Sequence, residues 1–389
     1  MPNGPSIGSV VVSLKIGSEL PTPAPASLMQ ALQKVEVTQT DEVPSGFQLT
    51  FHTEIDNTTS QDYAVVQDDL LQLFNRVVIS VVVNGVSTTL MDGFITGQQL
   101  VPSGRPGGSM FVVTGEDISV KMDAVEYSLE YPALGDAAIV AVVLAKYLFL
   151  GVIPEVIPTI SGAVPFGWTP LQNCSDRAWV SSLAQQNGAL FYVTPGPAPM
   201  TNVAYWGPPK LSEPLQDPLN VNMGPFTNVE QISFGIDGLK PFFVVGSVLE
   251  TLTDPYLPVP VATLSSTREP ALATKPVLEP SALVSLSVKK KLWIDQGFNP
   301  VKSAAVAQGM TDLSTDQVVT ATGRLDVSRY ANVLTAPGMV GVRGTGTNYD
   351  GKYYVKSVQH QISTRSGDWS YLQDFTLNRE GLGTTTRRV

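Results

Sequence analysis

The chain has 389 residues, enough for two or three domains, and only 15% of them are charged, against roughly 25% in ordinary soluble domains. The formal net charge of −10 argues against nucleic acid as a specific ligand, and the single cysteine, Cys174, excludes an intramolecular disulfide. Because the centres of subunit interfaces are depleted in charge, so low a charge content indicates a surface partly buried in an assembly.

Residues 1–131 have the pattern of several short antiparallel strands. Residues 47–54 alternate apolar and polar side chains, which is the period of a half-buried strand. Asn84-Gly85 separates two apolar runs and predicts a tight hairpin. The expected elements are strands at 10–16, 35–39, 47–54, 76–83, 88–100 and 110–114, and a helix-like stretch at 27–34. Together they predict a first small, tube-type antiparallel β-barrel.

Residues 132–218 change in character and predict an α/β insertion domain. Residues 137–153 are apolar except for Lys146, which is short for a membrane span and carries a charge. We therefore expect a helix buried in an assembly and no stable membrane insertion. A second helix is expected over 175–187, with Ser175 or Asp176 as its N-cap and Gly188 at its end, followed by a strand at 189–193.

Residues 219–389 return to strands and predict a second tube-type barrel. The expected strands are 229–234, 242–247, 317–325, 338–344, 353–363 and 371–378, with a helix near 302–309. The Pro-rich stretch 254–280 is interpreted as an extended loop or arm, and Asp350-Gly351 as a hairpin turn. Lysines 289–291 are interpreted as solvated charges, with contact to an acidic partner as the alternative. The expected fold class is thus mainly β (α+β): two barrels flanking an insertion.

Sequence motifs for catalysis or metal binding are missing. The two histidines, His52 and His360, stand in strand patterns without a nucleophile motif, and no HExxH, CxxC or EF-hand loop occurs. The acidic pairs, such as Asp68-Asp69, are adjacent in sequence, which does not place two carboxylates across a cleft. The glycines of 341–346 lack the P-loop lysine and predict a hairpin or close chain approach. We predict no catalytic, cofactor-binding or metal-binding residue.

Residues 338–380, GMVGVRGTGTNYDGKYYVKSVQHQIS…WSYLQDFTLNRE, resemble the end of the phage late control gene D family. That family includes the baseplate hub of contractile-tailed phages and the hub half of the type VI secretion spike protein. Residues 92–97 with 111–117 resemble the end of its first barrel, and residues 175–193 resemble its insertion. The motif residues are Gly93, Gly97, Gly115, Asp117, Asp176, Trp179, Gly344, Asp350, Gly351, Tyr354, His360 and Arg379.

The resemblance implies a structural baseplate hub of a contractile injection system. In such a homotrimer, two barrels per subunit form a pseudo-sixfold ring that adapts the hexameric inner tube to the trimeric spike. The implied partners are the inner tube protein, a spike protein on a separate chain and other baseplate components. Because the N-terminus does not resemble a secretory signal, we expect assembly in the cytoplasm and then incorporation into a phage tail or tail-like particle.

Two other functions remain as alternatives. A tail-tip cell-wall hydrolase needs two convergent carboxylates. A tail adhesin or carbohydrate-binding protein would present Trp168, Trp206 and Trp369 on a concave surface, although core or interface anchoring explains tryptophans more simply.

Overall fold

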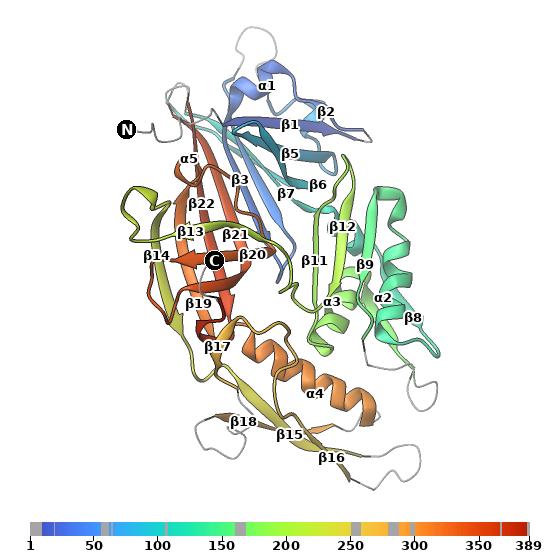
Figure 1. Cartoon of the computed structure of the whole chain (residues 1–389). Helices are drawn as coiled ribbons and strands as arrows, with labels where there is room; N and C mark the ends of the chain where they lie inside the picture. Colours follow the sequence, from blue (N-terminus) through green and yellow to red (C-terminus); the bar gives the residue numbers. More distant parts are fainter. Residues whose placement is uncertain are drawn as a thin grey trace.

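Figure 1 shows the computed structural model, which describes residues 10–18, 20–55, 62, 63, 65–105, 108–159, 169–249, 258–278, 288–295, 300–365 and 368–386. Strands dominate these residues, as the sequence predicts. One large sheet runs through the molecule. A helix-containing insertion lies on one side of it, and a smaller sheet backed by one long helix lies below it (Figure 1).

The first strand-rich region is an antiparallel run in the order β3-β4-β7-β6-β5-β1-β2. Its elements are β1 (Val11–Gly17), β2 (Thr22–Pro23), α1 (Ala26–Ala31), β3 (Leu32–Thr40), β4 (Gly46–His52), η1 (Asp69–Leu71), β5 (Arg76–Val83), β6 (Val86–Val101) and β7 (Met110–Asp117). The predicted hairpin is confirmed, because Asn84 and Gly85 have φ angles of 50° and 81°, the left-handed values of a type I′ turn. The helix-like stretch is shorter than expected, because Leu32 already pairs with Phe51 of β4.

The second strand-rich region has the order β14-β19-β22-β21, and β21 also pairs with β20, which pairs with β13. Its elements are β13 (Leu215–Asn220), η4 (Gly224–Phe226), β14 (Val229–Ile236), β19 (Val319–Asp326), α5 (Val327–Tyr330), β20 (Gly338–Arg343), β21 (Gly351–Arg365), β22 (Asp368–Arg379) and β23 (Gly381–Thr384). The strands expected here at 229–234, 317–325, 338–344, 353–363 and 371–378 are all present.

The two regions form one continuous sheet, because β3 pairs antiparallel with β21. The prediction of two separate closed barrels is therefore corrected: pairing among the described strands crosses from one region to the other and closes no ring in either. The length of β21 explains this, since its first residues pair with β20 and residues 357–363 pair with β3. We call the β3–β21 pairing the seam.

Apolar side chains of both regions share one core across the seam. Val35 and Val37 of β3 are fully buried, as are Val358 and Ile362 of β21. These positions follow the two-residue period of a strand, so one face of each strand is apolar. Full burial of one such side chain stabilises the fold by about 1.5–3 kcal/mol, and the seam is therefore held by burial as well as by hydrogen bonds.

The insertion contains two small sheets and two α-helices packed on an apolar core of their own. Its elements are η2 (Ile118–Asp123), β8 (Glu126–Glu130), α2 (Asp136–Ala145), η3 (Leu148–Leu150), β9 (Val152–Val156), β10 (Leu171–Ser175), α3 (Asp176–Gln186), β11 (Leu190–Pro195) and β12 (Asn202–Gly207). The helix predicted after Ser175 is confirmed, since the Ser175 hydroxyl accepts a hydrogen bond from the Ala178 amide at 3.3 Å and caps α3.

The apolar helix expected over 137–153 is wrong in its second half. Helix α2 ends at Ala145, and Gly151 has a φ of 85°, a left-handed conformation that ends helical structure. Val152 then begins β9, which pairs parallel with β12. Among the described residues, no helix combines the length and apolarity that crossing a bilayer requires.

A smaller sheet and a long helix, which we call the arm, lie below the large sheet (Figure 1). The arm consists of β15 (Phe242–Leu249), β16 (Pro258–Ala262), β18 (Lys289–Asp295) and α4 (Pro300–Thr315), with strand order β16-β15-β18. The stretch 254–280 is not simply a loop: it contains β16 and also β17 (Ala273–Pro276), which pairs with β23, while 254–257, 279 and 280 lie outside the described residues. Lysines 289–291 begin β18, and α4 is longer than the predicted helix.

Candidate functional site

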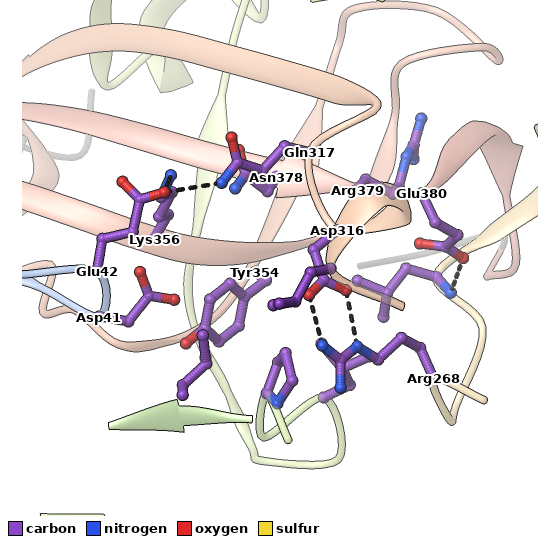
Figure 2. Close-up of a pocket in the computed structure, with 15 residues that line it drawn as sticks. Asp41, Glu42, Arg268, Asp316, Gln317, Tyr354, Lys356, Asn378, Arg379 and Glu380 are labelled. Atoms are coloured by element: carbon purple, nitrogen blue, oxygen red, sulfur yellow. Dashed lines mark hydrogen bonds and ion pairs between the residues drawn. The ribbon is translucent and has the colours of Figure 1, made fainter. Parts of the chain in front are cut away.

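One cavity lies where the large sheet, the insertion and the arm meet, and Figure 2 shows it. Its volume is about 100 Å³, well below the roughly 300–1,000 Å³ of sites for small molecules. It is lined by Asp41, Glu42, Leu190, Pro209, Leu211, Arg268, Leu272, Leu313, Asp316, Gln317, Tyr354, Lys356, Asn378, Arg379 and Glu380. The space is too small for the oligosaccharide that a cell-wall hydrolase binds.

A bidentate ion pair closes one side of the cavity. Arg268 Nε and Nη2 donate to the two carboxylate oxygens of Asp316 at 2.8 and 2.7 Å (Figure 2). Nη2 also donates to the carbonyl oxygen of Gly188 at 2.7 Å, just after α3. The Arg268 side chain is 8% exposed, so this pair is held away from water and connects the end of α4 to the insertion.

Asp41, which follows β3, faces the cavity from the opposite side. Burial raises the pKa of Asp41 to about 7, although the Tyr354 hydroxyl and the Lys356 ammonium group oppose that rise. The Tyr354 hydroxyl points toward the Asp41 carboxyl group (Figure 2). A carboxyl group with this pKa is partly protonated at neutral pH, so it adds less than a full negative charge to the buried interior.

The rim of the cavity is held by polar contacts between distant segments. Glu42 accepts from the Lys356 ammonium group at 2.6 Å and from the Gln317 amide at 3.0 Å (Figure 2). On the other side, Glu380 Oε1 accepts from the backbone amides of Leu272 and Ala273 at 2.6 and 2.7 Å. These contacts fasten the ends of β3, β21 and β22 to the segments that lead into the arm.

A second buried connection joins the first residues of α2 and α4. Asp136 forms a buried ion pair with Lys302 and accepts from the Asn187 side-chain amide at 2.6 Å. Nearby, a Cβ atom placed on Gly188 would lie 2.6 Å from the Cα atom of Gly309 in α4. The backbones are thus in direct contact, and only glycine fits at this crossing. We call the ion pairs of Arg268 and Lys302, with this glycine contact, the junction.

Three of the C-terminal motif residues form one buried cluster at the end of the β21–β22 hairpin. The Arg379 guanidinium group donates to the carbonyl oxygens of Asn348, Asp350 and Gly381 at 2.7, 3.1 and 2.9 Å. A Cβ atom on Gly351, whose φ is 133°, would lie 3.0 Å from Arg379 Nη1. The motif arginine therefore fixes the turn between β20 and β21 by donating to its backbone carbonyls.

The other C-terminal motif residues are also structural. Gly344 has a φ of 85° and lies against the backbone of the facing loop, as the hairpin interpretation predicts. Tyr354 lines the cavity, whereas His360 is fully buried within the seam, where it pairs with Val37. His360 Nδ1 lies 2.8 Å from the Tyr371 hydroxyl and 3.0 Å from the Gln373 amide, and burial lowers the pKa of His360 to about 3.

The first-region motif residues gather where β6 pairs with β7. Gly93 pairs with Asp117, and Gly97 lies at the irregularity between these two strands. Gly115 leaves no room for a side chain beneath a packed aromatic ring. Asp117 is buried and accepts from the Ser45 amide at 2.7 Å, and burial raises the pKa of Asp117. These residues shape the local pairing of β6 with β7 and its irregularity at Gly97.

The insertion motif residues hold α3 in place. Asp176, the first residue of α3, is fully buried and accepts from Lys146, Tyr147 and Gln172 at 3.1, 2.8 and 2.9 Å. Trp179 is buried in the insertion core, one turn further along. The three motif groups therefore lie in three separate places, and no single site unites them.

The sequence interpretation missed the residues of the junction. Arg268, Asp136 and Lys302 are charged residues in apolar or Pro-rich neighbourhoods, which in a chain so poor in charge is a usable signal. Among the described residues, no group of three or more His, Cys, Asp or Glu side chains is placed to hold a metal ion. Cys174 is half-buried, and burial raises the pKa of its thiol.

No protein-family model matches the sequence, and no curated protein matches it. Solved structures do match. The tail protein from Neisseria meningitidis MC58 has a TM-score of 0.63 and 14% identity, over 97% of this chain and 98% of that chain. The 43 kDa tail protein of prophage MuSo2 from Shewanella oneidensis has a TM-score of 0.63 and 13% identity, over 96% and 99% of the two chains.

A third match extends beyond phages. The E. coli c3393 protein, a component of the type VI secretion system, has a TM-score of 0.52 and 12% identity, over 92% of this chain and 74% of that chain. Identities this low show a shared fold. The resemblance stated for residues 338–380 is confirmed at that level: the chain has the fold of phage tail proteins and of type VI secretion components.

Proposed function

We propose that this chain is a structural baseplate hub of a contractile, phage-tail-like injection system. Three copies form a ring that adapts the hexameric inner tube to the trimeric spike. The observation that carries the proposal is the arrangement on the two sides of the seam. Each side presents four antiparallel strands in a comparable order, β3-β4-β7-β6 on one side and β21-β22-β19-β14 on the other.

Two comparable strand sets per chain explain how one protein meets two symmetries. A closed ring of three copies presents six such sets, which match a sixfold tube, while the chain itself keeps threefold symmetry for a spike. Every pair between these strands is antiparallel, so the two sets differ little in hydrogen-bond pattern.

The polar face of the sheet suits the wall of a passage. A groove of about 650 Å³ crosses the seam on this face and is lined mainly by small or uncharged polar residues such as Thr38, Gln359 and Thr376, with Ile232 and Phe375 beside them. The charges on it are paired: the Arg324 guanidinium group binds the Asp374 carboxylate at 2.6 and 2.7 Å. A wall of this kind offers a passing molecule mostly uncharged polar groups and little unpaired charge.

The proposal includes a division into a first tube domain at 1–131, an insertion domain at 132–218 and a second tube domain at 219–389. Its partners are two further copies, the inner tube protein, a spike protein and other baseplate components. The protein assembles in the cytoplasm and then becomes part of a tail or tail-like particle. The work is mechanical and needs no cofactor.

No specific observation favours the alternatives. The carboxylates of the central cavity surround too small a space for a glycan. Of the tryptophans that an adhesin would present, Trp206 is fully buried, Trp369 packs against the core, and Trp168 lies outside the described residues.

The experiment is to measure the mass of the purified full chain in solution, alone and with the tube and spike proteins of the same injection system. We expect a trimer that electron microscopy shows as a ring, with tube and spike proteins bound on opposite sides. A chain that stays monomeric in every mixture would refute the hub. Muralytic activity that disappears in Asp41→Asn, with the fold retained, would favour the hydrolase.

A further inference from the structure

Two strands of opposite charge, β18 and β8, each pair on one side only among the described strands. β18 is the outer strand of the arm and, among the described strands, pairs only with β15. β8 belongs to the two-stranded ribbon of the insertion and, within the same described set, pairs only with β10. An open edge exposes backbone amide and carbonyl groups that readily pair with another strand.

The β18 edge is basic. Lys289, Lys290 and Lys291 are exposed, and Leu292 beside them is 83% exposed. The ammonium groups of Lys289 and Lys291 lie 5.8 and 5.7 Å from the ring centroid of Phe242, while Lys290 alternates to the other face of the strand. Positive charge therefore flanks this edge on both faces. It repels a second β18, so two copies do not pair through the same strand.

The β8 edge is acidic. Glu126, Ser128 and Glu130 alternate along one face of the strand and are all exposed. Leu129 between them is 41% exposed. Each edge thus combines like charges with one exposed leucine, and the two edges are complementary in charge.

We propose that β18 of one copy pairs with β8 of the next copy in the ring. This inference rests on the proposed function and names the contact that closes the trimer. Within one chain the two strands lie apart, β8 in the insertion and β18 in the arm (Figure 1), so they meet only between copies. A contact between two different surfaces is heterologous, and such contacts form rings when the rotation closes.

A second copy fits this edge better than an unrelated partner, because it always supplies the matching strand. Long lysine and glutamate side chains reach one another across directly opposite and diagonal positions of a strand pair. The exposed side chains of Leu292 and Leu129 would then be buried in the contact. Opposite charges also fix which strand pairs with which, since like edges repel.

The experiment is a charge exchange, read as the trimer dissociation constant from solution mass at several concentrations. One variant carries Lys289→Glu, Lys290→Glu and Lys291→Glu, and a second carries Glu126→Lys and Glu130→Lys. We expect each variant to weaken every β18–β8 contact by at least about tenfold, which is about 1.4 kcal/mol per contact. A third chain carrying both sets is expected to regain most of the wild-type affinity.

The matched control for the triple-lysine variant carries Lys15→Glu, Lys240→Glu and Lys275→Glu. These changes reverse three exposed lysines elsewhere and alter the net charge by the same amount as the β18 variant. We expect this control to assemble like the wild type, and circular dichroism checks that every variant is folded. A wild-type trimer that no exchange disturbs would overturn the β18–β8 contact and leave the hub standing. So would two weakened variants whose combination regains nothing. A wild-type chain that never assembles would instead overturn the hub, and the contact with it.

Discussion

The seam and the junction connect parts of the same chain by opposite chemistry. The seam joins β3 to β21 through backbone hydrogen bonds and buried valine and isoleucine side chains. The junction joins the insertion to the arm through two largely buried ion pairs and a glycine contact. Burying charge costs desolvation energy that only a complete set of partners offsets. The junction is therefore sensitive to the loss of a single group, whereas the seam spreads its stability over many contacts.

The largest expected effect is the removal of one partner from the junction. Arg268→Ala leaves the Asp316 carboxylate buried without its ion pair and also removes the hydrogen bond to Gly188. We expect the free energy of unfolding to fall by about 3–5 kcal/mol, measured by urea denaturation.

The matched control is Arg324→Ala on the polar face of the sheet. Arg324 binds Asp374 with the same bidentate geometry, but its side chain is 36% exposed. Removing a solvated pair costs at most about 1 kcal/mol. Equal losses in the two variants would show that burial does not distinguish the junction from the sheet surface.

The glycine contact provides a second test. Gly309→Val places a Cβ atom 2.5 Å from the Gly188 amide nitrogen, in contact with backbone that has no room to move. We expect α4 to be pushed away from the insertion and the free energy of unfolding to fall by about 2–3 kcal/mol. Ala304→Val, at an exposed position of the same helix, is the control and should change it by less than about 0.7 kcal/mol. A Gly309→Val variant as stable as this control would contradict the contact.

This contrast also explains what the sequence could predict. The alternation over 47–54, the Asn84-Gly85 turn and the Ser175 cap are local signals, and each element they predicted is present. The seam pairs Val37 with His360, residues more than 300 positions apart, and no local pattern reports such a pairing. The two regions were therefore predicted as separate barrels.

The site was harder to predict than the fold. Motif residues such as Asp117, Asp176 and Arg379 were identified from resemblance, and they bind backbone and neighbouring side chains in three places. The junction residues carry no motif, because an ion pair between Arg268 and Asp316 depends on how distant segments pack. The run 137–153 misled for a related reason: its apolar composition fits a helix or a buried strand equally, and only the pairing of β9 decides between them.

Two buried titratable groups, His360 in the seam and Asp41 at the wall of the cavity, give opposite responses to pH. At the seam, burial lowers the pKa of His360 to about 3 from its usual 6.5. Below pH 6.5 the His360 imidazole is protonated in the unfolded chain but stays neutral in the folded chain. The contribution of neutral His360 to the free energy of unfolding is therefore complete above pH 6.5 and is lost as pH falls toward 3. We expect His360→Gln to remove a slope of up to about 1.4 kcal/mol per pH unit in this window. Urea denaturation between pH 4 and 7 measures it, and an unchanged slope would show that His360 does not stay neutral.

At the wall of the cavity the sign is reversed. Burial raises the pKa of Asp41 to about 7 from its usual 3.8, so between about pH 4 and 7 the folded chain holds a proton that the unfolded chain has released. Stability from this group is therefore lost as pH rises through that window, again by up to about 1.4 kcal/mol per pH unit. Asp41→Asn cannot ionise, and we expect it to be more stable than the wild type at pH 8 and nearly equal to it at pH 4. The two windows overlap between about pH 4 and 6.5, and the two slopes have opposite signs, so they largely cancel in the wild-type chain. Each single variant removes one slope and should therefore show the slope of the other group. An Asp41→Asn profile that is displaced from the wild-type profile without a change in slope would contradict the burial of an ionisable group at the cavity wall.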